Sequence, residues 1–285
     1  MTQKQHPVPS SMTGPILNIA GYRFVDLPDR DELRAPLIDV CQAGGLRGTI
    51  LLAHEGINFF IAGSKEGIDL FLGHIEKDLR FLDIPLKTSH TAYQPFNRMN
   101  VRLKNEIISM GMGDVKPAEF TGEAIEPTEF KRWLDEGKAV TVLDTRNDYE
   151  IRLGTFTNAL ELDIGSFRSF PAAISELPDD LKDTPVVMFC TGGIRCEKAS
   201  VVMLEAGFKD VRQLKGGILG YFAQVGGAHW EGDCFVFDHR VAVTPELKES
   251  DAKQCFACRE PLTLNDQQSP SYVVEVSCPY CIHLR

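Results

Sequence analysis

The residues best suited to chemistry lie in one run, Cys190-Thr-Gly-Gly-Ile-Arg-Cys-Glu-Lys-Ala-Ser200. Residues 185–189, directly before it, are apolar as in a buried parallel strand, and we expect a helix over residues 197–206. Cys190 therefore stands at the carboxyl end of a strand, on a glycine-bearing loop that opens a helix. This context favours a nucleophilic cysteine over an inert buried one.

The loop after the cysteine is suited to hold negative charge. Its two consecutive glycines let the backbone curl so that several N–H groups point toward the loop centre. Those donors, the N-terminus of the expected helix and the Arg195 side chain all favour an anion, so we predict a lowered pKa for the Cys190 thiol. Cys190 and Arg195 are the predicted catalytic residues. The loop residues that form the cradle are Thr191, Gly192, Gly193, Ile194 and Arg195.

Four further residues could support this loop. Cys196 could resolve an oxidised or sulfur-bearing form of Cys190, although a small core residue facing the sheet is the interpretation that we favour. Asp144, Arg146 and Glu150 follow the first strand of the same pattern and could fix neighbouring loops through charge-assisted hydrogen bonds. A purely structural set of ion pairs would have the same sequence, so both roles stay open.

The elements that must position the loop alternate between strand and helix, which indicates a doubly wound parallel α/β sheet. Ligands in such sheets bind beyond the carboxyl ends of the strands, where Cys190 falls. The expected strands cover residues 140–143, 185–189 and 211–214. The expected helices cover residues 127–134, 167–177, 197–206 and 218–225.

The first hundred residues follow a different order, β-α-β-β-α-β, which indicates a ferredoxin-like or acylphosphatase-like α+β fold. The expected strands cover residues 16–24, 47–53, 56–62, 86–91 and 101–109, and the expected helices 29–43 and 64–78. A linker with glycine and proline follows at 111–122. We therefore expect three parts: a ferredoxin-like domain at 14–112, an α/β domain at 122–230 and a small cysteine-rich arm at 231–285.

The C-terminal arm holds two Cys-x-x-Cys pairs separated by 19 residues. This spacing fits a four-thiolate zinc ribbon, and so short an arm needs such a staple if it is to fold alone. We favour structural zinc over reduced or redox-labile cysteines on an arm docked against a larger core. The predicted ligands are Cys255, Cys258, Cys278 and Cys281.

The net charge of −10 argues at first sight against nucleic-acid binding. The acidity is concentrated in residues 116–254, which carry 16 basic and 24 acidic side chains. Residues 84–105 contain no Asp or Glu, and their basic residues are interleaved with aromatic ones. This pattern suits phosphates and unpaired bases, and a solvated strand edge equally well. The candidate RNA contacts are Lys87, Arg98, Arg102 and Lys104.

The sequence also bears on location. No stretch approaches the roughly 20 apolar residues of a membrane helix, and residues 1–11 are polar, without a signal region. We therefore expect a cytoplasmic protein without membrane contact, in which the eight cysteines do not form disulfides.

The loop resembles the active-site loop of the rhodanese family, over about residues 123–227. Residues 142–150 are similar to the family's strand followed by Asp-x-Arg-x-x-x-Glu, and Gly216-Gly-Ile-Leu-Gly-Tyr221 is similar to its closing segment. Residues 154–160 match more loosely, because Thr155 and Asn158 stand where the family usually has His and Gly. The resemblance implies a central rhodanese-like domain and a persulfide on Cys190. The loop is one residue shorter than that of the related dual-specificity phosphatases, which argues against hydrolysis of phosphate esters.

The whole chain from about residue 15 closely resembles the bacterial tRNA uridine(34) hydroxylase family. The resemblance rests on Leu51-Leu-Ala-His-Glu-Gly-Ile-Asn58, on the run that begins at Cys190 and on the cysteine pairs of the arm. It implies oxygen-dependent hydroxylation of uridine 34, in the anticodon loop of tRNA, to 5-hydroxyuridine, with molecular oxygen as co-substrate. No flavin, NAD or iron motif is visible, so the sequence leaves the electron donor open, as it does the oligomeric state.

Several alternatives remain at this point. Cys190 could attack C6 of the uracil and so make C5 nucleophilic, or it could carry a persulfide or a sulfenate. The main alternative function is a rhodanese-type sulfurtransferase that carries a persulfide on the same cysteine. A non-enzymatic RNA-binding protein is the other, and the intact loop from Cys190 to Arg195 argues against it.

Overall fold

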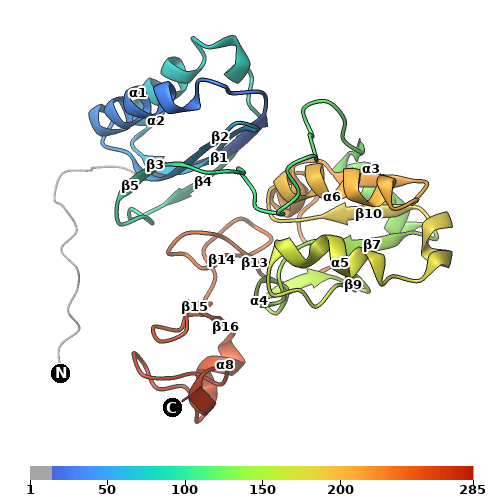
Figure 1. Cartoon of the computed structure of the whole chain (residues 1–285). Coiled ribbons are helices and arrows are strands. Elements are labelled where there is room, and N and C mark those ends of the chain that lie inside the picture. The colour runs from blue at the N-terminus through green and yellow to red at the C-terminus, as the bar shows by residue number, and fades with distance from the viewer. Residues whose placement is uncertain (1–14, 285) are drawn as a thin grey trace. The chain divides into compact units, whose positions relative to one another are not determined.

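The computed structural model describes residues 15–284, and the polar segment 1–11 lies outside them. The described residues divide into two compact units, one up to residue 104 and the other from residue 105 onward (Figure 1). Within the described residues, no helix is both long and apolar enough to span a membrane.

The first unit is the expected ferredoxin-like domain, extended by one edge strand. Its sheet has the order β4-β1-β3-β2-β5, in which β5 pairs parallel with β2 and the other neighbours are antiparallel. The strands are β1 (Ile16–Phe24), β2 (Arg47–Ala53), β3 (Gly56–Gly63), β4 (Lys87–Thr91) and β5 (Met99–Leu103).

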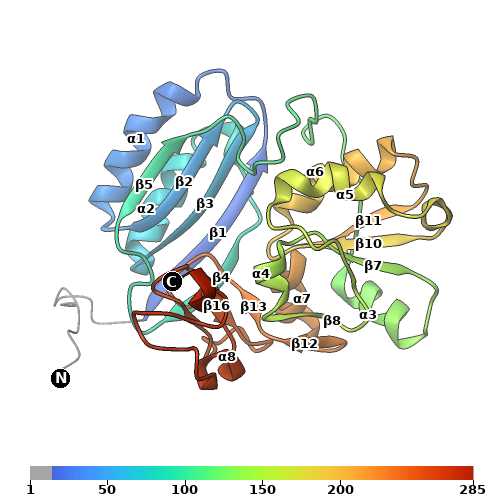
Figure 2. The same ribbon diagram turned by 60° about the horizontal axis from the view of Figure 1, so that its bottom comes forward.

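Two helices, α1 (Arg30–Ala43) and α2 (Lys65–Ile75), cover one face of this sheet (Figure 2). They bury apolar side chains against the strands, and the rings of Phe59 and Phe71 meet edge to face with centroids 5.3 Å apart. The 3-10 helix η1 (Leu79–Phe81) follows α2. The last strand ends at Leu103 rather than at residue 109, because the chain then leaves the sheet and buries Met110 in the core of the second unit.

The second unit contains the expected parallel sheet, in the order β6-β11-β10-β7-β9. Its central strand β10 is buried along its whole length. Alternate residues of a strand point to opposite faces, so Val186 and Met188 enter one core cluster and Val187 and Phe189 another. The strands are β6 (Glu123–Ile125), β7 (Thr141–Asp144), β9 (Leu160–Glu161), β10 (Val186–Phe189) and β11 (Val211–Leu214).

Helices pack on both faces of this sheet, which confirms the doubly wound arrangement. One core cluster draws on α5 (Phe170–Ser175) and α6 (Ile194–Glu205), and the other on α3 (Pro127–Asp135) and α7 (Gly217–Val225). The helix expected at 167–177 is shorter and begins as the 3-10 helix η2 (Phe167–Ser169), with Pro171 at the start of α5. The 3-10 helix η3 (Asp179–Asp183) leads into β10.

The chain beyond residue 230 is divided between the sheet core and a small separate core. Trp230, Cys234, Val236 and Val243 lie in the same cluster as α3 and α7. β12 (Trp230–Gly232) pairs with β8 (Gly154–Phe156), and β13 (Cys234–Phe235) pairs with β14 (Ala242–Val243). The remainder holds β15 (Lys253–Gln254), β16 (Pro261–Leu262), α8 (Leu264–Gln268) and η4 (Ile282–Leu284).

Candidate active site

Cys190 directly follows β10, and the loop between it and the next helix is shorter than the sequence predicted. We expected the helix from Glu197, but α6 begins at Ile194, so Arg195 and Cys196 lie in its first turn. The helix starts early because Gly193 adopts the left-handed conformation at its N-cap, with φ of 99°, which turns the chain into the helix within the loop itself.

A second glycine, at the start of α7, packs against the backbone of the loop that begins at Cys190. Gly217, with φ of 64°, lies at the start of α7, and a Cβ atom there would come within 2.4 Å of the Cys190 carbonyl oxygen and 2.7 Å of the Gly193 nitrogen. The next two N–H groups, of Ile218 and Leu219, donate to the carbonyls of Cys190 and Thr191 at 2.9 and 3.1 Å. The segment resembling the closing part of rhodaneses thus fixes the Cys190 loop by close backbone packing.

The Cys190 sulfur is surrounded by donors. The Gly193 N–H donates to it at 3.1 Å, and the Arg195 N–H and the Cys196 thiol also donate to it. Burial opposes ionisation of the Cys190 thiol, but the Cys196 hydrogen bond, the Arg195 charge and the two N–H groups outweigh it and lower its pKa to about 5. These contacts therefore favour the thiolate form of Cys190, in the direction that the sequence predicted.

This ionisation can be tested directly. We expect the thiolate ultraviolet absorbance of the protein, minus that of the Cys190→Ser variant, to appear with a midpoint near pH 5, because the folded loop stabilises the charged form. The same difference measured in denaturant is expected near the ordinary cysteine pKa of about 8.5. A midpoint near 8.5 in the native protein would contradict the assignment.

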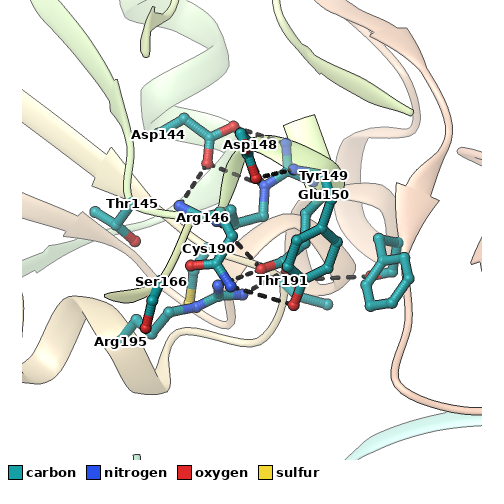
Figure 3. A network of polar contacts seen from close by, with 12 residues as sticks. Asp144, Thr145, Arg146, Asp148, Tyr149, Glu150, Ser166, Cys190, Thr191 and Arg195 are labelled. Atoms are coloured by element: carbon teal, nitrogen blue, oxygen red, sulfur yellow. Dashed lines mark hydrogen bonds and ion pairs between the residues drawn. The ribbon is translucent and has the colours of Figure 1, made fainter. Parts of the chain in front are cut away.

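Glu150 is the supporting residue that reaches the loop. It lies in α4 (Asp148–Ile151) and pairs in a bidentate manner with Arg195, from Nη1 to Oε1 at 2.5 Å and from Nη2 to Oε2 at 2.8 Å (Figure 3). Both side chains are almost completely buried. Burial raises the Glu150 pKa, but the Arg195 charge and hydrogen bonds outweigh it, so the pKa stays below its ordinary value. The pair fixes Arg195 and leaves its positive charge beside Cys190.

Asp144 and Arg146 pair with each other rather than with the loop. The Arg146 guanidinium donates from Nη2 to Asp144 at 2.6 Å and to the Gly154 carbonyl at 2.6 Å, and both charged side chains are fully buried. Thr155, which replaces the usual His of rhodaneses, donates to Asp144 at 2.8 Å. This ion pair therefore joins the end of β7 to β8, while Glu150 alone of the predicted carboxylates contacts Arg195.

The structure adds aromatic residues that the sequence analysis did not single out. The Phe237 ring lies 5.9 Å from the Arg195 guanidinium carbon, and 48% of the residue is exposed. Phe235 meets it edge to face at 5.1 Å and meets Tyr149 at 5.4 Å. The alternating run Cys234-Phe-Val-Phe was a sequence signal for them, but we had assigned it to the arm. An exposed ring beside a cation can stack on a planar base.

The four cysteines of the arm come together as predicted. Their Sγ atoms all lie within 4.8 Å of one another, with Cys258 and Cys278 3.5 Å apart and Cys255 and Cys281 4.0 Å apart. Tetrahedral zinc with Zn–S bonds of about 2.3 Å needs sulfurs roughly 3.8 Å apart, so the set fits this metal. Arg152, at the end of α4, pairs with Glu260 of the arm and lies over the Tyr280 ring.

The four basic candidates of residues 84–105 do not form one patch. Lys87 lies on β4 and Arg102 on β5, the two opposite edges of the sheet, because the chain crosses the whole sheet between them. Lys87 is half-buried, with its Nζ 4.8 Å from the Tyr22 ring centroid. Arg98, Arg102 and Lys104 are exposed on the β5 side. A groove of about 310 Å³ opens there between α1 and β5, lined by Arg34, Ile38, Gln42, Met99, Asn100, Val101 and Arg102.

Known proteins resemble both units. The family model of the UPF0176 acylphosphatase like domain matches residues 16–107, and that of the rhodanese-like domain matches residues 126–224. The chain is 52% identical over 272 residues to the tRNA uridine(34) hydroxylase of Cupriavidus necator, with 94% of this chain and 96% of that protein covered. A protein of the same name from Burkholderia thailandensis is 48% identical over 274 residues, and the match covers 93% of each chain. A solved rhodanese-like domain from Anabaena is 26% identical, with 38% of this chain and 78% of that domain covered at a TM-score of 0.32.

Proposed function

Because the chain belongs to the tRNA uridine(34) hydroxylase family, we propose that it hydroxylates uridine 34, in the anticodon loop of tRNA, to 5-hydroxyuridine with molecular oxygen. The observation that carries this proposal is the buried Cys190 thiolate, held by backbone N–H groups and by the Arg195–Glu150 pair. The alternative of a plain sulfurtransferase is less well supported, because relatives similar over nearly their whole length bear the hydroxylase name. The cytoplasm, where tRNA is modified, is the proposed compartment.

The proposal is tested with the purified full chain. The protein is incubated with tRNA from a strain that lacks the modification, in air and with excess thiol reductant, and the nucleosides are identified by mass spectrometry. We expect 5-hydroxyuridine in air and none under argon. If the chain instead transfers sulfur from thiosulfate to cyanide rapidly and leaves the tRNA unchanged, the sulfurtransferase function replaces the proposed one.

We further propose that tRNA contacts the β5 edge of the first unit. Arg98, Arg102 and Lys104 are exposed there, and Arg34 lines the same groove as Arg102 and donates from Nε to the Val101 carbonyl at 3.0 Å. Exposed guanidinium groups around a groove can contact phosphates, while neighbouring amides such as that of Asn100 can hydrogen-bond sugar or base edges.

Substitution of the groove arginines is expected to weaken tRNA binding. Arg102→Glu should lower the affinity for tRNA several-fold to about tenfold at low salt and reduce the slope of log K against log salt by about 1, because a phosphate contact is lost. Affinity is measured by fluorescence anisotropy over a salt series. The control is Lys65→Glu, a 73% exposed side chain on α2, which should leave the slope unchanged. Equal effects of both variants would show that net charge alone matters.

We also propose that the four arm cysteines bind one structural zinc ion, as the sulfur distances support. The protein is expected to contain about one zinc per chain, and Cys258→Ser with Cys278→Ser should remove it, because two of the four thiolates are lost. Elemental analysis measures the metal, and cobalt substitution tests the four-thiolate geometry. Cys41→Ser, in the first unit, is the control. Protein that neither contains zinc nor takes it up would disprove the site.

A further inference from the structure

We propose that the buried thiols of Cys190 and Cys196 supply the two electrons that oxygen-dependent hydroxylation requires, and that each turnover converts this pair to a disulfide. The inference rests on the proposed function, because it names the reductant of that same reaction. It gives Cys196 a chemical role in addition to its place in the core.

The two cysteines are brought together by the early start of α6. Cys196 lies in the first helical turn, where its N–H donates to the Gly193 carbonyl at 3.0 Å. The N–H of the same Gly193 donates to the Cys190 sulfur at 3.1 Å, so one residue positions both cysteines. The Thr145 hydroxyl lies 3.7 Å from the Cys196 sulfur. A helix that began at Glu197 would have left Cys196 on the loop, without this fixed orientation.

The surroundings of the two sulfurs suit an internal redox pair. Both are fully buried in the same core cluster, so the pair is shielded from bulk solvent. Cys190 is held as a thiolate and Cys196 as the thiol that donates to it. Once Cys190 carries an oxidised sulfur, Cys196 is the other thiol of the same core cluster and so the nucleophile placed to attack it. Among the described residues, the other cysteines lie elsewhere: Cys41 in the first unit, Cys234 in the opposite core cluster and four in the arm.

The reaction balances with these two thiols alone. The uracil C5–H group, one oxygen molecule and two S–H groups give C5–OH, one disulfide and one water molecule. The O–O bond breaks, one oxygen atom bonds to C5, and the other leaves as water with the hydrogens of the two thiols. The carbon and the sulfur pair each lose two electrons. An external small thiol then reduces the disulfide between turnovers by exchange.

The test uses the full chain, fully reduced, freed of reductant under argon, and then mixed with tRNA in air. We expect 5-hydroxyuridine to stop at about one per chain, with an equal amount of Cys190–Cys196 disulfide found by peptide mapping after thiol blocking, and turnover to resume when dithiothreitol is added. Many turnovers without reductant, or product without disulfide, would overturn the inference.

Two variants sharpen the test. Cys196→Ser keeps a hydrogen-bond donor beside Cys190 but removes the second electron source, so product without reductant should fall at least about tenfold. Cys41→Ser, which alters a buried cysteine of the other unit, should leave the yield of one per chain unchanged. Because disulfide mapping uses the unaltered protein, it remains decisive if Cys196→Ser folds poorly. Absence of 5-hydroxyuridine from the unaltered protein even with excess reductant would instead reject the proposed function.

Discussion

Cys190→Ser is expected to lower the rate of 5-hydroxyuridine formation at least about 10³-fold, because serine cannot form the anion that the loop stabilises. The Gly193 N–H and the Arg195 charge would then face a neutral hydroxyl that remains protonated throughout the physiological pH range. The measurement is single-turnover formation of 5-hydroxyuridine on tRNA, at enzyme in excess over substrate, so that product release does not enter.

The serine side chain is nearly isosteric with cysteine, so the fold should persist and tRNA affinity should change little. Cys41→Ser is the matched control for loss of a buried thiol, since Cys41 also lies in a core but belongs to the other unit. Activity of Cys190→Ser within about tenfold of the unaltered protein would mean that this thiol does not react, and that the loop binds an anion without forming one itself.

Glu150→Gln is expected to destabilise the protein by about 3–5 kcal/mol at pH 7, because the buried Arg195 guanidinium loses the carboxylate to which it donates two hydrogen bonds. The Glu150 carboxylate has a pKa below its ordinary value, so it stabilises the fold above the ordinary glutamate range, and this contribution is lost as the pH falls through the lowered pKa. The difference in free energy of unfolding between the variant and the unaltered protein should therefore be largest near neutral pH and become smaller in acid. Urea denaturation at several pH values measures it.

The control for this substitution is Asp179→Asn. Asp179 also accepts an ion pair, from Lys182 at 2.7 Å, but its side chain is 91% exposed, so its loss should leave the urea midpoint nearly unchanged. If Glu150→Gln costs less than about 1 kcal/mol, water or another group must replace the carboxylate, and the buried pair would not be what fixes Arg195.

Local sequence patterns were sufficient to predict the fold of each of the two units. The apolar run at residues 185–189 identified a strand buried on both faces, and the structure places β10 in the centre of the sheet. The alternation of strands and helices gave the doubly wound unit, and the β-α-β-β-α-β order gave the ferredoxin-like one. These features follow from hydrophobic periodicity and turn residues within short windows, which is why they can be read before the fold is known.

The start of α6 could not be predicted from the local sequence. Residues 191–196 carry two glycines and a charged residue, which by composition continue a loop. The helix begins at Ile194 because Gly193 takes a left-handed conformation and Gly217 packs directly against the loop from α7. This packing joins segments that are far apart in the chain, so the start of the helix cannot be predicted from local helix and loop propensities.

The sequence by itself identified the candidate reactive residue and the kind of loop that carries it, since Cys190, the two glycines and Arg195 lie close together in the chain. Only the tertiary structure decided their partners. Glu150 reaches Arg195 while Asp144 turns to Arg146, and the basic residues of one short stretch separate to opposite edges of a sheet. The physical reason is that buried charges and sheet edges are paired by the packing of distant segments, and the order of residues along the chain does not specify that packing locally.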